Sequence, residues 1–449
     1  MNKKDFNSIK NEFNHQIKSF DDSKICNQKI FSICFELKSD LNIFFNQISL
    51  KHHPIFFSSN DFSSFSIIKE HGYSFYNEYD YSSKKDEFLK VISNMCFINA
   101  KKNNKSFIFG GFNFDLNESN NDIWKDIPIA NFTLPRYTFI DSKLIINIFL
   151  DNRATIEKIK QLFLKYIDDL ELILFNKKTN DIKSALLNIS DLTSNELHHK
   201  KINDLLDIFR TGDSDLIKVV FSRIKKASFS AQVPLINIYK SLLDKNSNSM
   251  NFLYSISNNL NIIGSTPELI LSKLNHKIES ESIAGSNYSK NNDFIYDEKE
   301  VIEQKIVTDY IINFLKQNSD NIVYDKKPKI KKSSNIEHLH TSFNADLIND
   351  KNILDLLAQI HPTPAIGGYP KDKAVDIIRK YKENRGWYGG PIGWIDNNLD
   401  GKFYLNIRSG LGVNKDLYLF SGSGITNKSN SDNEWDETEE KFKLMLESL

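Results

Sequence analysis

Acidic side chains at helical spacing are the first features of this sequence that could do chemistry. Glu300 and Glu303 form one E-x-x-E pair, and Glu434 and Glu437 form another. The spacing puts each pair on one face of a helix, where like charges repel by roughly 0.2–0.5 kcal/mol. Carboxylates that converge in a cleft need a cation, and oxygen ligands of this kind suit Mg2+. Taken alone, each pair is more often a solvated helix face.

Three other polar residues stand where proton transfer is chemically feasible. Lys218 lies in an otherwise almost wholly apolar segment, and desolvation there would favour the neutral amine, a usable general base. A lysine at a strand edge can instead extend its ammonium into water, which is the commoner arrangement. Glu268 directly follows the turn-forming GSTP at 264–267, so it is either a turn-exposed acid or a positioned general acid. His338, in EHLHT, is equally consistent with a satisfied core histidine.

The hydrophobic pattern indicates the elements that must position these residues. Strands are expected at 31–37, 106–115, 137–150, 215–223, 251–257 and 268–274, the second of them with a hairpin or bulge at its Gly pair. Helices are expected at 155–175, 197–210 and 297–317, and from about Ser431, which is a suitable N-cap. The apolar stripe predicted for the third helix consists of Val301, Ile302, Ile306, Tyr310, Phe314 and Leu315.

Glycine is concentrated near the C-terminus, where 11 of the 17 glycines lie between Gly367 and Gly424. Residues without a Cβ let the backbone approach a small ligand closely or turn sharply around one. A run of tight hairpins would need the same composition. Glycine content alone therefore leaves a ligand site and a hairpin run as alternatives.

Composition limits the classes of function. The chain of 449 residues is 40% hydrophobic, which is enough for a sizeable core. Lys plus Arg equals Asp plus Glu at 58 each, so no global field favours a nucleic acid partner. The polar start and the lack of a stretch of about 20 apolar residues predict a cytoplasmic protein with no membrane contact. The three cysteines have no CxxC spacing, which predicts buried thiols rather than a disulfide framework or a zinc site.

Three C-terminal segments together resemble the signature of chorismate-binding enzymes. They are HPTPAIGGYP at 361–370, RGWYGGPIGW at 385–394, and GSGI with SDNEWDETEEK within 422–441. Upstream matches are KVVFSR at 218–223, GSTPELIL at 264–271, SIAGS at 282–286, EKEVIEQKIV at 298–307 and EHLHT at 337–341. The resemblance covers about 194–449 and continues weakly to FGGFNFD at 109–115 and LPRYTF at 134–139.

The resemblance implies an α+β fold in which two large, mostly antiparallel β-sheets pack together with helices on the outside. Residues 1–193 would be the variable N-terminal part of this domain, and residues 194–449 the chorismate-binding catalytic region. It also implies a Mg2+ site with Glu303 and Glu437 as direct ligands and with Glu300 and Glu434 nearby. The substrate-binding residues that it implies are Gly285, His338, Ala365, Tyr388, Arg408, Gly422, Gly424 and Lys441.

Some of these implied roles are specific, and two residues depart from the pattern. Arg408 and Tyr388 match positions that hold the enolpyruvyl carboxylate of chorismate, a task suited to a planar guanidinium. Gln304 stands where a histidine often follows the metal-binding glutamate, and Glu300 replaces a common aspartate. Because residues around the ligands orient them, these departures bear on metal affinity.

Lys218 separates the branches of the family. Isochorismate and salicylate synthases use water, whereas anthranilate and aminodeoxychorismate synthases receive ammonia from a glutaminase partner. In the water-using branch a lysine at this position activates water for attack at C2 of the ring, and Glu268 would protonate the departing C4 hydroxyl. Ala365 resembles isochorismate synthases, since the lyase and ammonia branches commonly have threonine there. We therefore expect an isochorismate synthase with no obligatory glutaminase subunit, as a monomer or homodimer, with salicylate synthase as the main alternative and an ammonia-using subunit as a weaker one.

Overall fold

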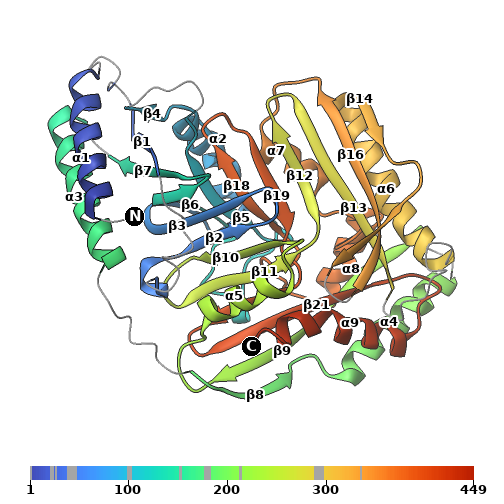
Figure 1. Ribbon diagram of the computed structural model, residues 1–449. Coiled ribbons are helices and arrows are strands. Elements are labelled where there is room, and N and C mark those ends of the chain that lie inside the picture. The colour runs from blue at the N-terminus through green and yellow to red at the C-terminus, as the bar shows by residue number, and fades with distance from the viewer. Residues whose placement is uncertain are drawn as a thin grey trace.

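The computed structural model shows how the chain folds around a large sheet (Figure 1). It describes residues 3–20, 25, 28–37, 48–98, 104–150, 154–175, 184–211, 215–287, 298–333 and 336–449. The helices are α1 (Lys3–Lys18), α2 (Glu78–Ser93), α3 (Ile156–Phe175), α4 (Asn195–Thr211), α5 (Leu235–Lys245), α6 (Glu298–Asn318), α7 (Ile353–Ile360), α8 (Lys371–Lys380) and α9 (Ser431–Leu446).

The strands all belong to one hydrogen-bonded sheet. They are β1 (Ile30–Glu36), β2 (Ile55–Ser58), β3 (Ser63–Phe75), β4 (Cys96–Phe97), β5 (Phe107–Phe112), β6 (Ala130–Ile140), β7 (Lys143–Phe149), β8 (Leu186–Asp191), β9 (Lys218–Phe229), β10 (Met250–Ser255), β11 (Leu260–Thr266), β12 (Leu269–Leu274), β13 (Lys277–Asn287), β14 (Ser319–Tyr324), β15 (Lys329–Ser333), β16 (Ile336–Leu347), β17 (Gly368–Tyr369), β18 (Pro391–Asp396), β19 (Gly401–Leu405), β20 (Ser409–Val413) and β21 (Asp416–Ile425). Within the described part of the chain, only β1 and β4 pair in parallel.

The long strand β6 is the point from which two arms of the sheet diverge. Along one edge β6 pairs with β3, and this arm continues through β2, β10, β11, β20, β21 and β9 to β8. On its other edge β6 pairs with β5, and the second arm continues through β18, β19, β12 and β13 to β16. The fold is thus a mixed one with a large, curled antiparallel sheet and helices around it. The expectation of two separate sheets is wrong in this respect, because continuous hydrogen bonds through β6 join both arms.

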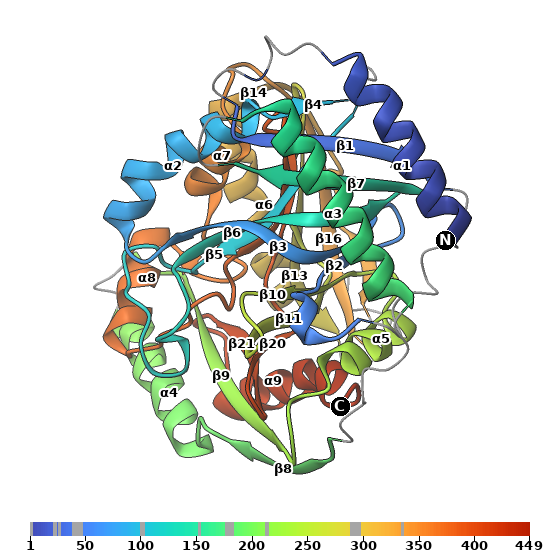
Figure 2. The same cartoon turned by 90° about the vertical axis from the view of Figure 1, so that its left-hand side faces the viewer.

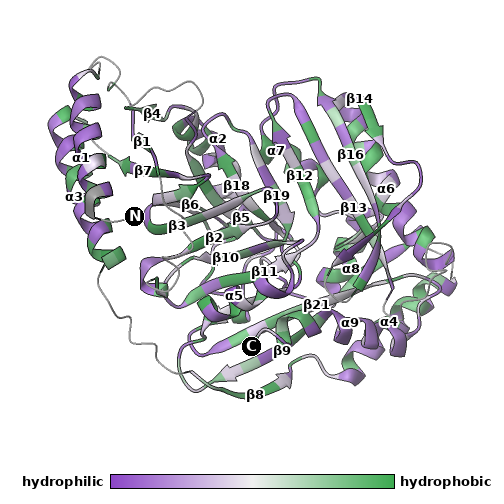
Figure 3. Cartoon of the chain, in the orientation of Figure 1, coloured by the Kyte–Doolittle hydropathy of each residue, from purple (hydrophilic) through white to green (hydrophobic). Residues whose placement is uncertain are grey.

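Each face of the sheet has its own hydrophobic core. Successive strand residues point to opposite faces, so Phe252 and Tyr254 enter one core while Leu253 enters the other. The core that contains Leu253 lies under α1 and α3, which cross β1 and β7 side by side (Figure 2). It also lies under α5 and α9. In Figure 3 much of α1 is hydrophilic, as expected for a helix that covers this core from the solvent side. The burial of both faces explains why the strands read as apolar runs rather than as alternating patterns.

Most elements expected from the hydrophobic pattern are present, with shifted ends. The helices expected at 155–175, 197–210 and 297–317 are α3, α4 and α6, and the segment at 215–223 is the start of β9. The segment at 137–150 is a hairpin of β6 and β7 rather than one strand, because Asp141 and Ser142 adopt positive φ and turn the chain. The strand β11 was not expected, and the GST of the GSTP segment lies inside it, so only its end is a turn.

Two side-chain expectations for the helices need correction. The buried side chains of α6 are Gln304, Val307, Ile311, Phe314, Leu315 and Asn318, whereas Ile302 of the expected stripe is 41% exposed. Polar Gln304 is buried because its amide donates to Ser282 O and Thr341 Oγ1, which the hydrophobic pattern alone does not reveal. The N-cap of α9 is Asn430 rather than Ser431, and its side chain accepts hydrogen bonds from the backbone of Asp432 and Asn433.

The remaining features of the fold concern membrane helices, cysteines and the link between the two parts of the chain. Across the described residues, no helix combines the length and the apolar character that a membrane crossing requires. Cys34 is buried as expected and Cys96 is half-buried, while Cys26 lies outside the described residues. Pairings β2–β10, β5–β18 and β8–β9 join the part before residue 194 to the part after it.

The Gly110–Gly111 pair lies inside β5, and neither a hairpin nor a bulge occurs there. Its register is continuous with β6 on one side and with β18 on the other. A Cβ at Gly110 would lie 2.2 Å from the backbone oxygen of Asn131, and one at Gly111 would lie 2.4 Å from that of Pro391. The pair is therefore required for close packing of three backbones, and not for a turn.

We predict that Gly111→Ala destabilises the protein by roughly 1–3 kcal/mol, the usual cost of overpacking against atoms that cannot move aside. Gly412→Ala is the control, since its Cβ would meet the flexible Leu235 side chain at 3.1 Å and would make only an ordinary van der Waals contact with the backbone, at 3.7 Å from Asn261 O. Urea unfolding of both variants measures the difference. Equal stability of the two variants would contradict this account of β5.

Candidate functional site

A cavity between the two arms of the sheet gathers most of the predicted site residues. It encloses about 620 Å³, including its open mouth. Ten of the fourteen predicted residues line it: Glu268, Gly285, Glu303, His338, Ala365, Tyr388, Arg408, Gly422, Gly424 and Lys441. Of the other four, Lys218, Glu300 and Glu437 contact lining residues. Glu434 lies behind them and pairs with Lys299. One arm supplies Lys218, Gly422 and Gly424, and the other supplies Gly285 and His338.

Lys218 is buried on an interior strand. It is the first residue of β9, which pairs with β17 on one side and with β21 on the other, and its side chain is 0% exposed. Its Nζ donates to Glu303 Oε1 at 2.6 Å. A Cβ at Gly424 would lie 2.5 Å from the Lys218 side chain, so glycine is needed there. The arrangement excludes the alternative of a lysine that extends into water from a sheet edge.

Glu268 is held between β11 and β12 in an environment that favours its protonated form. It is 4% exposed. Burial, and then the nearby Glu281 carboxylate, raise the pKa of Glu268 to about 8, although Lys218, Lys331 and Lys441 act in the opposite direction. Glu268 therefore keeps its proton near neutral pH and can donate it, which removes the alternative of a turn-exposed acid.

The four carboxylates on α6 and α9 lie close enough to perturb one another. Burial, and then Glu303, raise the pKa of Glu300 to about 7. Burial, and then Glu437, raise the pKa of Glu434 to about 7. Glu300 and Glu434 lie in the first turns of α6 and α9, where the helix dipole partly offsets the repulsion. Neither pair is a solvated helix face.

Lysine ammonium groups are interspersed with these carboxylates. Lys299 Nζ donates to Glu434 Oε1 at 3.1 Å, and Lys441 Nζ donates to Glu437 Oε1 at 2.5 Å and to Gly422 O at 2.9 Å. Burial lowers the pKa of Lys299, but Glu434, Glu437, Glu300 and Glu303 together outweigh it and hold that pKa above its ordinary value. One ammonium thus feels all four carboxylates.

The carboxylates are not yet arranged as ligands of one ion. Among the residues that the structure describes, no three His, Cys, Asp or Glu side chains are grouped as a metal-binding set. Each pairs instead with a lysine or a backbone amide, such as Ser286 N, which donates to Glu300 Oε2 at 2.8 Å. The donors nevertheless suit Mg2+, because all are carboxylate oxygens and Glu434 Oε2 is buried without a hydrogen-bond partner. An unpaired buried carboxylate oxygen is costly unless something binds it.

His338 and Arg408 form a hydrogen-bonded pair at the cavity wall. His338 Nδ1 lies 3.0 Å from the carbonyl oxygen of Gly285, which can only accept, so Nδ1 carries the proton. His338 Nε2 then accepts from Arg408 Nη2 at 3.4 Å. Burial, and then the Arg408 charge, lower the pKa of His338 to about 3, so the imidazole is neutral. Arg408 has a φ of +49°, an unfavourable backbone conformation that directs its guanidinium here.

Tyr388 and Ala365 also line the cavity. Tyr388 stacks on Phe420 with ring centroids 5.2 Å apart, and burial raises its pKa to about 12, so its hydroxyl stays protonated. The segment that carries Ala365 is fixed by Arg385, which donates to the neighbouring Ile366 O at 2.9 Å. The small Ala365 side chain leaves space in the cavity.

Sequence reasoning missed several buried polar residues behind the cavity. Glu383 accepts hydrogen bonds from Lys201, Ser222 and Arg385. Burial alone would raise its pKa, but Lys201 and Arg385 lower that pKa to about 2. Arg385 opens the motif RGWYGGPIGW and Lys299 lies inside EKEVIEQKIV, so both could have been noticed there. Only the tertiary structure shows what they contact.

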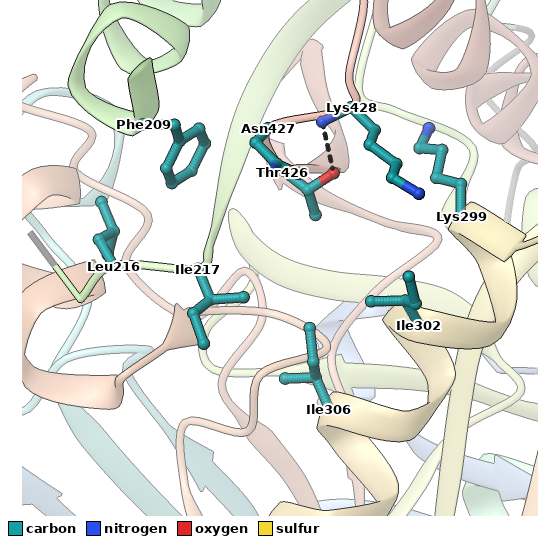
Figure 4. Close-up of a pocket in the computed structure, with 9 residues that line it drawn as sticks. All are labelled: Phe209, Leu216, Ile217, Lys299, Ile302, Ile306, Thr426, Asn427 and Lys428. Atoms are coloured by element: carbon teal, nitrogen blue, oxygen red, sulfur yellow. Dashed lines mark hydrogen bonds between the residues drawn. The ribbon is translucent and has the colours of Figure 1, made fainter. Parts of the chain in front are cut away.

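Lys299 also lines a second pocket (Figure 4). Its lining residues are Phe209, Leu216, Ile217, Lys299, Ile302, Ile306, Thr426, Asn427 and Lys428. Ile302, exposed on α6, and Lys428 both face this pocket. Lys299 therefore borders both the carboxylates and an open, largely apolar space.

Comparisons with known proteins agree with this geometry. The family model described as chorismate binding enzyme matches residues 15–449. The chain is 28% identical to isochorismate synthase MenF of Bacillus subtilis over 76% of this chain and 74% of that protein. It is 28% identical to isochorismate synthase EntC of Escherichia coli K12 over 53% of this chain and 63% of that protein, so this second match spans less than two thirds of the relative.

Solved structures show the same fold at lower identity. The structure of MenF, the menaquinone-specific isochorismate synthase from Escherichia coli, superposes with a TM-score of 0.77 over 98% of both chains at 17% identity. Anthranilate synthase component I from Streptococcus pneumoniae superposes with a TM-score of 0.66 at 18% identity, over 93% of this chain and 92% of that one. The likeness to both establishes the fold alone. With the family model matching nearly the whole chain, the protein belongs to the chorismate-binding enzyme family and is homologous to isochorismate synthases over most of its length.

Proposed function

We propose that this protein is an isochorismate synthase that converts chorismate to isochorismate. The observation that carries the proposal is the pairing of a buried amine, Lys218, with a carboxylic acid that keeps its proton, Glu268, at one cavity. Residues 194–449 supply all fourteen predicted site residues and would form the catalytic region. The similarity to isochorismate synthases supports the same assignment.

The proposed reaction adds one water and releases another. Lys218 takes a proton from water while the water oxygen bonds to C2 of the ring. The ring double bonds shift, the C4–O bond breaks, and Glu268 gives its proton to the departing hydroxyl, so that water leaves and the net change is an isomerisation. Hydroxide is a poor leaving group and water a poor nucleophile, so both need assistance in one transition state.

Glu303 and Glu437 would hold Mg2+ directly, with Glu300 and Glu434 behind them, and the ion would neutralise these carboxylates and bind the ring carboxylate of chorismate. Arg408 and Tyr388 would hold the enolpyruvyl carboxylate, with neutral His338 leaving the full charge of the guanidinium available to it. The backbone at Gly285, Gly422 and Gly424 and the ammonium of Lys441 would complete the contacts. Ala365 would leave room beside the ring.

We expect Lys218→Ala and Glu268→Gln each to lower kcat by about 100-fold or more, the usual contribution of general acid or base catalysis. Chromatography of the products from chorismate and Mg2+ gives the rate and the product together. Near-normal isochorismate formation by either variant would refute the roles of these residues. Release of pyruvate with salicylate from the unaltered protein would indicate a salicylate synthase instead, and a product that requires ammonia would indicate the third branch.

The buried proton of Glu268 should also appear in the pH dependence of stability. The folded protein holds this proton up to a pKa of about 8, whereas the unfolded chain loses it near the ordinary value of 4.5. The free energy of unfolding therefore falls as pH rises from about 4.5 to about 8, because the unfolded state binds fewer protons there. Glu268→Gln lacks this loss. We expect the variant to gain stability relative to the unaltered protein across this pH range, as measured by urea unfolding at each pH.

A constant stability difference between Glu268→Gln and the unaltered protein from pH 4.5 to 8 would contradict the raised pKa. Urea unfolding does not depend on catalysis. It therefore also shows whether a loss of activity in Glu268→Gln reflects loss of the acid or loss of the folded state.

Lys299 should compete with a divalent cation for the carboxylates. We expect Lys299→Met to bind Mg2+ about threefold to tenfold more tightly, because one partly screened ion pair contributes about 1 kcal/mol. Isothermal titration calorimetry on the protein without substrate measures this affinity. Lys428→Met is the control, because Lys428 lines the same pocket but pairs with Glu298 rather than with the four carboxylates. Weaker binding by Lys299→Met would contradict the competition.

A further inference from the structure

Helix α9 presents two neighbouring faces with different tasks. Glu434, Glu437 and Lys441 face the cavity side, and Glu437 and Lys441 are joined by a hydrogen bond of 2.5 Å. Trp435 and Thr438 lie on the adjacent face, since a helix turns by about 100° per residue. The helix packs on β21 beside β9 (Figure 1). Any rotation of α9 about its axis would move both acidic residues together.

Arg223 on β9 contacts the second face at several points. Its side chain is 0% exposed, and the guanidinium carbon lies 3.0 Å from the centroid of the Trp435 ring. Its Nη1 donates to Thr438 Oγ1 at 2.6 Å and to Trp435 O at 3.3 Å, and its Nη2 donates to Glu439 Oε1 at 2.7 Å. These partners alternate along the helix with Glu434 and Glu437. One planar group thus fixes the helix by stacking and by a fork of hydrogen bonds.

The partners of Arg223 are themselves tied to the sheet. Thr438 also donates to Trp435 O at 2.7 Å, and Ser421 of β21 donates to Thr438 O at 3.0 Å. Asp191 of β8 accepts from Arg223 Nη2 at 2.9 Å. Because Arg223 and Lys218 lie on the same strand, the contact relates α9 to the strand that carries the proposed base.

We infer that Arg223 is a positioning residue for the cation site, which sets the rotation of α9 so that Glu434 and Glu437 face Glu300 and Glu303. This inference rests on the proposed function, since it assumes that these carboxylates bind a divalent ion. Arg223 itself does not line the cavity. Its effect would reach the ion only through the helix.

The chain offers a matched control two residues away. Lys225 also pairs with Asp191 and Glu439, at 3.0 and 3.1 Å, and is 8% exposed. No contact of Lys225 with Trp435 or Thr438 is present in the described structure, although its ammonium lies 5.3 Å from the Phe442 ring centroid. Arg223→Lys keeps the positive charge but loses the planar fork, whereas Lys225→Ala loses a charge and keeps the fork. The two variants therefore separate geometry from electrostatics.

The test is the Mn2+ affinity of the full chain without substrate, measured by electron paramagnetic resonance of free Mn2+. We expect Arg223→Lys to raise the Kd for Mn2+ at least tenfold and Lys225→Ala to change it less than twofold. At saturating Mg2+, the KM for chorismate of Arg223→Lys should change less than threefold, because Arg408 and Tyr388 are untouched. The inference would be overturned if Arg223→Lys bound Mn2+ as tightly as the unaltered protein and showed only a lower Tm.

A second variant keeps the test decisive if Arg223→Lys does not fold. Thr438→Val removes one hydroxyl acceptor of the fork with little change of shape, and we expect a threefold to fivefold rise in the Kd for Mn2+. An unchanged Kd in this variant would likewise overturn the role of Arg223. If the unaltered protein bound no Mn2+, the cation site and with it the proposed function would be refuted. Equal binding by all variants would instead refute only the role of Arg223.

Discussion

Mutual repulsion among four carboxylates is the constraint on which this site depends. Glu300 and Glu303 on α6 and Glu434 and Glu437 on α9 are brought together in a poorly solvated region, where burial and then the neighbouring carboxylates raise the pKa of Glu300 and Glu434. The fold moderates this repulsion in two ways. Two of the four acids lie in the first turn of their helices, where the backbone dipole favours negative charge, and lysine ammonium groups lie between them. Binding of the divalent ion that we propose would relieve repulsion that folding has already imposed.

The curled sheet brings those helices together. Because β6 pairs with β3 along one edge and with β5 on the other, the sheet divides into two arms whose ends approach across the cavity. Helix α6 packs on β13 and β16 of one arm, and α9 packs on β21 of the other. The carboxylate cluster is thus assembled across the gap between the arms. Interactions that fix either helix, such as the Arg223 contact with α9, therefore bear on the whole cluster.

Two buried glutamates, Glu268 and Glu383, differ in charge because their surroundings differ. Burial and the Glu281 charge outweigh three nearby lysines and raise the pKa of Glu268 to about 8, whereas Lys201 and Arg385, which donate hydrogen bonds directly to Glu383, lower its pKa to about 2 despite burial. The first can exchange a proton near neutral pH. The second is a permanent anion that holds the backbone of β9 through Ser222.

The amino-acid sequence by itself indicated which residues meet at the cavity, through the resemblance of its glycine-rich motifs and paired acids to those of chorismate-binding enzymes. It also indicated four of the nine helices in the described residues, α3, α4, α6 and α9, since a repeat of 3.6 residues is readable in one segment. It did not reveal the division of the sheet at β6, the role of Gly110 and Gly111, or the buried face of α6, all of which depend on contacts between distant segments. Nor did it reveal that Lys299 feels four carboxylates or that Arg223 holds α9. Protonation, pairing and helix rotation are set by distances across the fold, and only the tertiary structure decides those distances.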